Sequence, residues 1–285
     1  MTLVWGGLSL GAVYAIIAIG YNIVFIASGV FNFAHAQLLM VGTFIAYWGL
    51  AVVRLQVVLV FVVGGLIVGA LAFGEERVAI RGIRGTEGQL VTTVGVATLL
   101  NGATQLIWGG QAFTVPFLNG NTVWTVLGGR VQPIQIVLIA VAVLLTVALL
   151  LYARHSMIGL AMLTMAEDRE AASLRGVNVR AVALGAFIAS GVMAGALGPV
   201  VGPETFAVAT LGSALALKGF VALALGGFGS LTGGLIGGVL IGLVEEYTTR
   251  YLGSSYVNMI VLGVLLVVLM TRPTGLFGKV RERMV

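Results

Sequence analysis

The chain has 285 residues, of which 59% are hydrophobic and only 9% are charged, and its mean hydropathy is +1.11. A soluble domain needs a far more charged surface, so this composition excludes one and predicts a single membrane domain over residues 1–285. The sequence has no cysteine, which excludes disulfides and thiolate metal sites. Its formal net charge of +5 does not indicate nucleic-acid binding, because the basic residues gather in short loops between apolar stretches.

These apolar stretches predict an all-α fold, a polytopic membrane helix bundle of eight or nine transmembrane helices. A helix needs roughly 20 apolar residues to cross a bilayer. The stretches lie at 3–27, 30–52, 56–73, 89–108, 134–152, 181–202, 211–228, 233–249 and 256–271. No basic segment precedes the first stretch, so we expect a retained helix there and not a cleaved signal peptide.

Two places decide between eight and nine spans. The polar segment 28–35 is either a cytoplasmic turn or a break at membrane depth, where it would have to face protein or water. Lys218 interrupts the stretch at 211–228, and we expect its side chain to snorkel to an interface. Eight spans with a re-entrant segment are therefore the alternative to nine.

Charge bias orients the bundle, because loops rich in Arg and Lys stay cytoplasmic. The basic segments are the loop at 74–88 with Arg77, Arg81 and Arg84, the loop at 153–180 with Arg154, Arg169, Arg175 and Arg180, and the tail with Arg272, Lys279, Arg281 and Arg283. The segment at 109–133 has a single basic residue, Arg130, and is expected outside. With nine spans, the N-terminus lies outside and the C-terminus in the cytoplasm.

Glycines recur every four residues near the C-terminal end. The two sets are Gly229, Gly233 and Gly237, and Gly234, Gly238 and Gly242. This spacing places each set along one face of a helix, where small residues allow close helix–helix packing. The alternative is a packing seam beside a translocation path.

The predicted spans contain little of the chemistry that proton-coupled carriers or enzymes need. Glu204, Glu245 and Glu246 fall near the outer ends of spans, which argues against a proton-driven carrier. Only two histidines, His35 and His155, are present, so a histidine-rich metal site is not expected. No phosphate-binding loop occurs, so any ATP that drives this protein binds another subunit.

Polar side chains inside the predicted spans are the candidates for lining a translocation path. They are Tyr14, Asn22, Asn32, His35, Gln37, Asn101 and Gln105. Asn32 and His35 are three residues apart and Asn101 and Gln105 four apart, so each pair can share a helix face. The alternative for all of them is a structural role, with bonds to neighbouring backbone or between helices.

The basic loop at 153–180 contains a short segment with helical signals. Acidic residues begin it at 167–170, helix-forming residues follow, and Arg175 and Gly176 end it. Acids favour the N-terminus of a helix, bases favour the C-terminus, and glycine suits the position after it. The loop therefore predicts a short cytoplasmic helix.

The same segment resembles the EAA loop of binding-protein-dependent permeases, through Glu170-Ala171-Ala172 and Gly176. In that superfamily the loop forms a coupling helix that docks into a groove of the ATPase. The resemblance implies an ATPase-coupling set of Glu167, Asp168, Glu170, Ala171, Ala172, Arg175 and Gly176.

Three further motifs narrow the resemblance to branched-chain amino-acid permeases of the LivH type. They are Gly11-Ala12-Val13-Tyr14-Ala15 with Asn32-Phe33-Ala34-His35-Ala36-Gln37, the run from Lys218 to Ser230, and Arg272-Pro273-Thr274-Gly275-Leu276-Phe277-Gly278. The resemblance covers nearly the whole chain. That family commonly reads Asn-Phe-Ala-His-Gly-Glu in the first motif, so Ala36 and Gln37 depart from it and leave the substrate open.

The resemblance implies an assembly in the bacterial cytoplasmic membrane. It would contain this permease, a second related permease, two subunits that bind ATP and Mg, and an external solute-binding protein. The implied solutes are branched-chain amino acids, urea, short amides or aromatic acids. The alternatives are a stand-alone secondary transporter or channel, a sugar permease of the same superfamily, and an intramembrane enzyme based on Ser190 and His35, which the lack of further catalytic groups disfavours.

Overall fold

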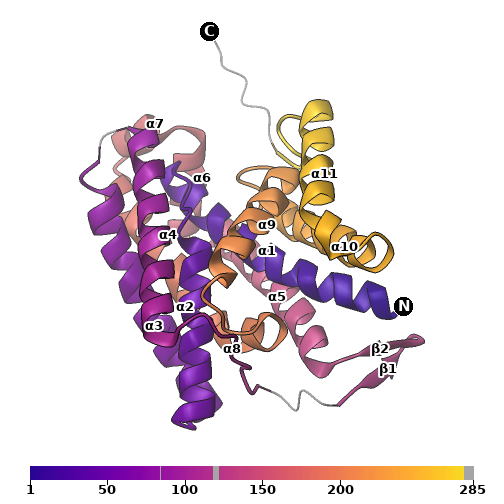
Figure 1. Ribbon diagram of the computed structural model, residues 1–285. Helices are drawn as coiled ribbons and strands as arrows, with labels where there is room; N and C mark the ends of the chain where they lie inside the picture. The colour runs from indigo at the N-terminus through magenta and orange to yellow at the C-terminus, as the bar shows by residue number, and fades with distance from the viewer. Residues whose placement is uncertain (84, 118–121, 279–285) are drawn as a thin grey trace.

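The computed structural model describes residues 1–83, 85–117 and 122–278 (Figure 1). Helices make up most of this part of the chain, and its one sheet is a short antiparallel hairpin of β1 (Trp124–Val126) and β2 (Gly129–Val131). The all-α prediction is therefore confirmed. The basic residues Arg84, Lys279, Arg281 and Arg283 lie outside the described residues.

Each predicted apolar stretch lies mainly on a helix. The helices are α1 (Thr2–Ser28), α2 (His35–Tyr47), α3 (Val57–Glu75), α4 (Thr86–Trp108), α5 (Pro133–His155), α6 (Met157–Glu167), α7 (Arg169–Leu174), α8 (Val179–Thr205), α9 (Leu211–Gly226), α10 (Leu231–Tyr251) and α11 (Val257–Thr271). π-Helical turns at Trp48–Val52 and Glu76–Ile80 extend α2 and α3, and a 3₁₀ turn at Ser254–Tyr256 precedes α11. Within the described residues, seven helices are long and apolar enough to cross a membrane. The shorter α9 and the more polar α10 occupy the other two stretches.

Helix α1 forms the centre of the bundle. It is apolar on every side, and such a helix is buried by its neighbours. Its closest partner is α10, because glycines on both helices let the two backbones approach. A Cβ on Gly11 would lie 2.7 Å from the Cα of Val239, and side chains on Gly238 or Gly242 would collide with the backbone of α1.

The glycines of α10 pack against two neighbouring helices, α1 and α9. Gly238 and Gly242 face α1, whereas Gly233 and Gly237 pack against the backbone of α9, and Gly234 lies beside Ala18 and Asn22 of α1. Gly229 departs from the prediction. It lies in the turn before α10 with a φ of +81°, a left-handed conformation that favours glycine, and not on a helix face.

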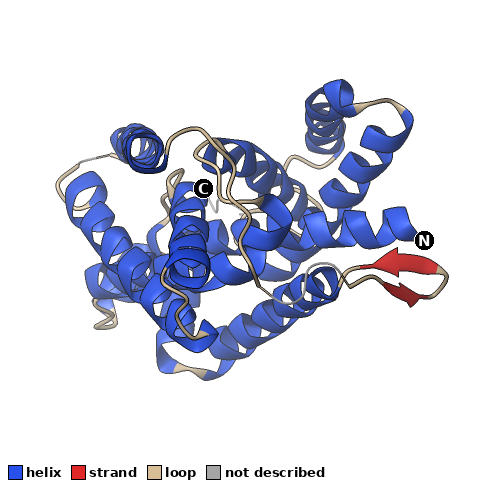
Figure 2. Cartoon of the chain, turned by 60° about the horizontal axis from the view of Figure 1, so that its bottom comes forward, coloured by secondary structure: helices blue, strands red, loops and turns tan. Residues whose placement is uncertain are grey.

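The two ends of α1 separate the loops into two groups. The 2-stranded hairpin lies beside the N-terminus (Figure 2), where Trp5 donates a hydrogen bond to the carbonyl of Val126. The basic segments gather near the other end: Ile80 packs with Val24, and Arg169 contacts Ser28. This grouping agrees with the sidedness that the charges predict.

The connection between α1 and α2 is a buried, non-helical segment. Val30, Phe31 and Asn32 are at most 7% exposed. Helix α2 begins beside Gly20, since the imidazole of His35 occupies the place that a side chain on Gly20 would take. The segment therefore runs back along the last two turns of α1. Of the two sequence alternatives, the structure has the break within the bundle, and the irregular backbone faces protein.

Helix α3 is longer than the sequence predicts. It continues through Glu75 and the π-helical turn to Ile80, so the described loop before α4 is short. Glu75, expected in a cytoplasmic loop, is instead 4% exposed.

Candidate functional site

The short helix α7 begins where the sequence predicts. The Asp168 carboxylate accepts hydrogen bonds from the backbone N–H groups of Glu170 at 2.9 Å and Ala171 at 3.0 Å. An aspartate at this position satisfies amide groups that the helix leaves without partners, and it also interacts favourably with the helix dipole.

The C-terminal end of α7 depends on Gly176. Its φ is +87°, and its N–H donates to the carbonyl of Ser173 at 3.0 Å. The next N–H, of Val177, donates to the carbonyl of Ala172 at 3.1 Å. This pair of bonds is the Schellman motif, in which glycine takes the left-handed position.

The predicted coupling residues on and around α7 differ in their exposure to solvent. Ala172 is fully buried, so it supports the helix from inside and is not available for docking. Glu167, Glu170 and Arg175 are exposed, as is the predicted helix end at Gly176. Leu174, which the sequence reasoning missed, is 88% exposed and is the large apolar side chain that α7 offers to a partner.

Arg169, the first residue of α7, links this helix to the transmembrane bundle. Its guanidinium donates a hydrogen bond to the carbonyl of Ser28, the last residue of α1. A cation suits the C-terminus of a helix, where carbonyl groups lack partners. Partial burial lowers the pKa of Arg169 from its ordinary value. The sequence resemblance did not include this residue in the coupling set.

His35 and Ser190 form a buried polar contact between α2 and α8. Their Nδ1 and Oγ atoms are 2.8 Å apart, and the Ser190 hydroxyl also donates to the carbonyl of Gly20 at 3.3 Å. Both side chains are at most 1% exposed. The pair therefore has no access for a substrate in this structure, which argues against the intramembrane-enzyme alternative and places His35 among helix-packing contacts.

Asn32 bonds to its own segment, as the structural alternative for this residue requires. Its Oδ1 accepts from the N–H of Ala34 at 2.8 Å. The carboxylate of Glu75 lies beside the Asn32 side chain, at the edge of an apolar groove of about 320 Å³ between α2, α3 and α4.

Asn22 holds the turn between α9 and α10. Its side chain donates to the carbonyl of Ser230 at 2.9 Å and accepts from the N–H of Gly229 at 2.8 Å. The C-terminal motif packs on the same turn, because Leu276 and Phe277 donate to carbonyl groups at the end of α9. Two of the motifs behind the family resemblance, the run from Lys218 to Ser230 and the motif from Arg272 to Gly278, therefore meet here, and Asn22 lies between the two parts of the N-terminal motif.

Lys218 is paired inside the bundle, so the prediction that it snorkels is wrong. Its Nζ lies 2.5 Å from Oε1 of Glu245 in α10, and the hydroxyl of Tyr14 in α1 donates to Oε2 of the same carboxylate at 2.5 Å. This network connects three helices. Tyr14 is thus a partner of an ion pair.

Gln37 and Asn101 are the path candidates from different helices that the structure brings together. Both lie against Gly212, in the first turn of α9. The amide nitrogen of Asn101 donates to Oγ of Ser213 at 2.7 Å. Gln105, one turn further along α4, is exposed.

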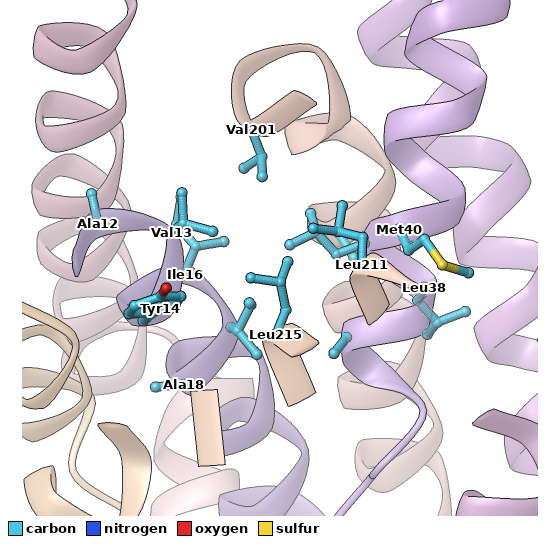
Figure 3. Close-up of a cluster of buried hydrophobic side chains, with 14 of the residues drawn as sticks. Ala12, Val13, Tyr14, Ile16, Ala18, Leu38, Met40, Val201, Leu211 and Leu215 are labelled. Atoms are coloured by element: carbon cyan, nitrogen blue, oxygen red, sulfur yellow. The ribbon is translucent and has the colours of Figure 1, made fainter. Parts of the chain in front are cut away.

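Among the described residues, no group of three or more His, Asp or Glu side chains is placed to hold a metal ion. Figure 3 shows the apolar surroundings of the first turns of α9: Leu211 and Leu215 lie between Val13 and Ile16 of α1 and Met40 of α2. The chain thus combines a short capped helix at the basic end of the bundle with a polar cluster inside the apolar bundle.

Known proteins are similar in sequence to nearly the whole chain. Residues 3–270 match the family model described as branched-chain amino acid transport system / permease component. The chain is 32% identical over 293 residues to the high-affinity branched-chain amino acid transport system permease protein LivH of Escherichia coli strain K12, an alignment that covers 96% of this chain and 94% of that one. It is 31% identical over 288 residues, with the same coverage, to the corresponding permease protein BraD of Pseudomonas aeruginosa.

A sugar permease is also similar, at a lower level. The ribose import permease protein RbsC of Haemophilus influenzae is 26% identical over 257 residues, covering 87% of this chain and 78% of that one. The family model and the two more similar relatives agree with each other. The chain therefore belongs to the family of permease components of branched-chain amino acid transport systems.

Proposed function

We propose that this chain is the membrane-spanning permease subunit of a binding-protein-dependent, ATP-driven importer for branched-chain amino acids or related small solutes. The observation that carries this proposal is family membership over residues 3–270. The capped helix α7, on the side of the bundle where the basic segments gather, supports it, because a permease without its own nucleotide site needs a docking element for an ATPase.

The proposed assembly contains a second related permease, two ATPase subunits that hold ATP and Mg, and an external solute-binding protein. It lies in the bacterial cytoplasmic membrane, with the N-terminus outside and the C-terminus in the cytoplasm. The charge bias supports this orientation, since Arg77, Arg154 and Arg175 all belong to the basic side. The exposed apolar side chains of α4 and α11 supply the surface for lipid and for a second permease.

The contacts at Arg169 suggest how force reaches the membrane. ATP-driven closure of the ATPases moves α7, and the hydrogen bond to Ser28 passes this movement to the end of α1. The buried segment 29–34 and the start of α2 follow, because both pack along the same part of α1. The bundle then changes from an inward-facing to an outward-facing form, into which the binding protein releases its solute.

Reconstitution tests this proposal. Proteoliposomes that contain the chain with its partner permease and ATPases should import radiolabelled leucine under one condition only. ATP must be on the side of the membrane where the ATPases lie, and the binding protein must be on the opposite side. A stand-alone transporter or channel would move solute without ATPases. A sugar permease would import ribose and not leucine, although the greater identity to amino-acid permeases favours leucine.

Cysteine labelling tests the orientation in the same system. The sequence has no cysteine, so each introduced thiol reports on one position. A cysteine in place of Trp124 should react from outside intact cells, whereas one in place of Ser173 should react only after permeabilisation. The opposite pattern would overturn the orientation.

A further inference from the structure

The first turn of α9 leaves two backbone donors without partners. The N–H of Leu211 donates to Val208 and that of Ala214 to Thr210, but those of Gly212 and Ser213 have no hydrogen-bond partner among the described residues. Thr210 at the N-cap provides no side-chain bond either. Free N–H groups at a helix N-terminus, together with the helix dipole, attract a negative group.

Two acceptors without partners meet the same turn. Oε1 of Gln37 and Oδ1 of Asn101 are both enclosed and accept no hydrogen bond, and Gln37 is only 4% exposed. A Cβ on Gly212 would lie 2.9 Å from Cγ of Gln37 and 3.3 Å from Oδ1 of Asn101, so both side chains converge on this glycine. Buried acceptors of this kind are costly unless a donor reaches them.

The position is also reachable. Ser213, Ala214 and Leu217 are exposed and lie on one face of α9, so a small solute can approach the first turn at Ser213. The solute reaches the enclosed oxygens of Gln37 and Asn101 once these two side chains move. Gln37, Asn101, Gly212 and Ser213 carry no charge, so a ligand with a net charge would find no counter-ion among them. A ligand that fits must donate to two oxygens, accept from two N–H groups and have no net charge.

We propose that Gln37, Asn101 and the first turn of α9 bind the zwitterionic head group of a neutral α-amino acid as it crosses the membrane. The ammonium donates to Oε1 of Gln37 and Oδ1 of Asn101, and the carboxylate accepts from the N–H groups of Gly212 and Ser213. This head-group site rests on the proposed importer function and adds to it the part of the solute that the permease recognises.

Leucine uptake by the complete importer tests the head-group site. Gln37→Leu and Asn101→Leu should each lower leucine uptake into proteoliposomes by about tenfold or more, because each removes a bond to a charged group. ATP hydrolysis stimulated by the binding protein should change less than about twofold, since neither residue contacts α7. Thr98→Val, an exposed change one turn away on α4, is the control and should transport normally.

Labelling tests the same site without depending on turnover. Ser213→Cys in the purified complex should react with a small thiol reagent, and leucine should protect it. The analogues 4-methylpentanoate, which lacks the ammonium, and 3-methylbutylamine, which lacks the carboxylate, should not protect. Ser254→Cys, in the turn before α11, should react whether or not leucine is present.

The outcomes separate the two proposals. A wild-type complex that imports no neutral amino acid would overturn the proposed function. A wild-type complex that imports leucine, with unimpaired Gln37→Leu and Asn101→Leu variants, would overturn only the head-group site. Equal protection of Ser213→Cys by leucine and by both analogues would also overturn it, because the protection would then come from the apolar side chain.

Discussion

Arg169 and Ser28 lie 141 residues apart in the sequence, and the guanidinium of the first donates a hydrogen bond to the carbonyl of the second. The contact joins the start of α7 to the end of α1. Among the described helices long enough to cross a membrane, α1 is the most buried, so movement of α7 has a direct route into the centre of the bundle.

The first prediction concerns this contact. Arg169→Ala should leave ATP hydrolysis in the assembled complex near its normal rate but lower leucine uptake by about tenfold, because a charge-assisted bond that transmits movement is lost. Uptake and hydrolysis are measured together in proteoliposomes. Arg154→Ala, an exposed arginine of the same loop region, is the control. If the two variants import leucine equally well, Arg169 has no part in coupling.

The second prediction concerns the docking face of α7. Leu174→Cys should crosslink to an ATPase subunit, since this side chain is 88% exposed, whereas Ala172→Cys should not, since Ala172 is fully buried. Gly176→Val should abolish the Leu174→Cys crosslink, because a β-branched residue resists the φ of +87° that ends the helix. Crosslinking is read on denaturing gels. A crosslink from Ala172→Cys of equal strength would show that α7 docks through another face.

The elements of this fold were predictable where local pattern decides them. The apolar stretches predicted every long helix, and the charges from Asp168 to Arg175 with Gly176 predicted α7, because caps and helix dipoles act within one turn. Gly229 shows the limit of spacing: the four-residue pattern continued past the start of α10, but the backbone there turns with a positive φ.

The side-chain contacts between helices could not be predicted from the sequence alone. Lys218 was expected at an interface because no partner for its charge lies nearby in the sequence. Its actual partner, Glu245, lies on another helix, 27 residues away. Of the polar candidates, Gln37 and Asn101 meet at Gly212, while Tyr14, Asn22 and His35 serve separate contacts. Arg169 did carry a signal, since a cation at a helix N-terminus opposes the helix dipole and so calls for an outside partner. Leu174 carried none, because a leucine in a short helix is ordinarily expected to be buried.

The third prediction concerns the contact between α1 and α10. Gly238→Leu should lower the thermal stability of the complex and its yield from membranes, because any side chain there collides with the backbone of Ala15. Overpacking of this kind costs about 1–3 kcal/mol or more. Gly263→Leu on α11 is the matched control, since nothing lies within 4 Å of the position that its Cβ would take. Equal stability of the two variants would contradict the packing described for α1 and α10.

The last prediction concerns the ion pair between Lys218 and Glu245. Their side chains are 16% and 13% exposed, so removal of one partner leaves a charge in a mostly buried position. Lys218→Met should therefore destabilise the complex by about 3–5 kcal/mol, as expected for a broken buried pair.

Glu245→Gln should also destabilise the complex, although Tyr14 can still bond to the new amide. The double variant should be more stable than Lys218→Met alone, because no unpaired charge remains. Melting temperatures of the purified complex measure all three, with Arg250→Met at the exposed end of α10 as the control. If the two single effects simply add in the double variant, the 2.5 Å contact between Lys218 and Glu245 does not act as a pair in the membrane.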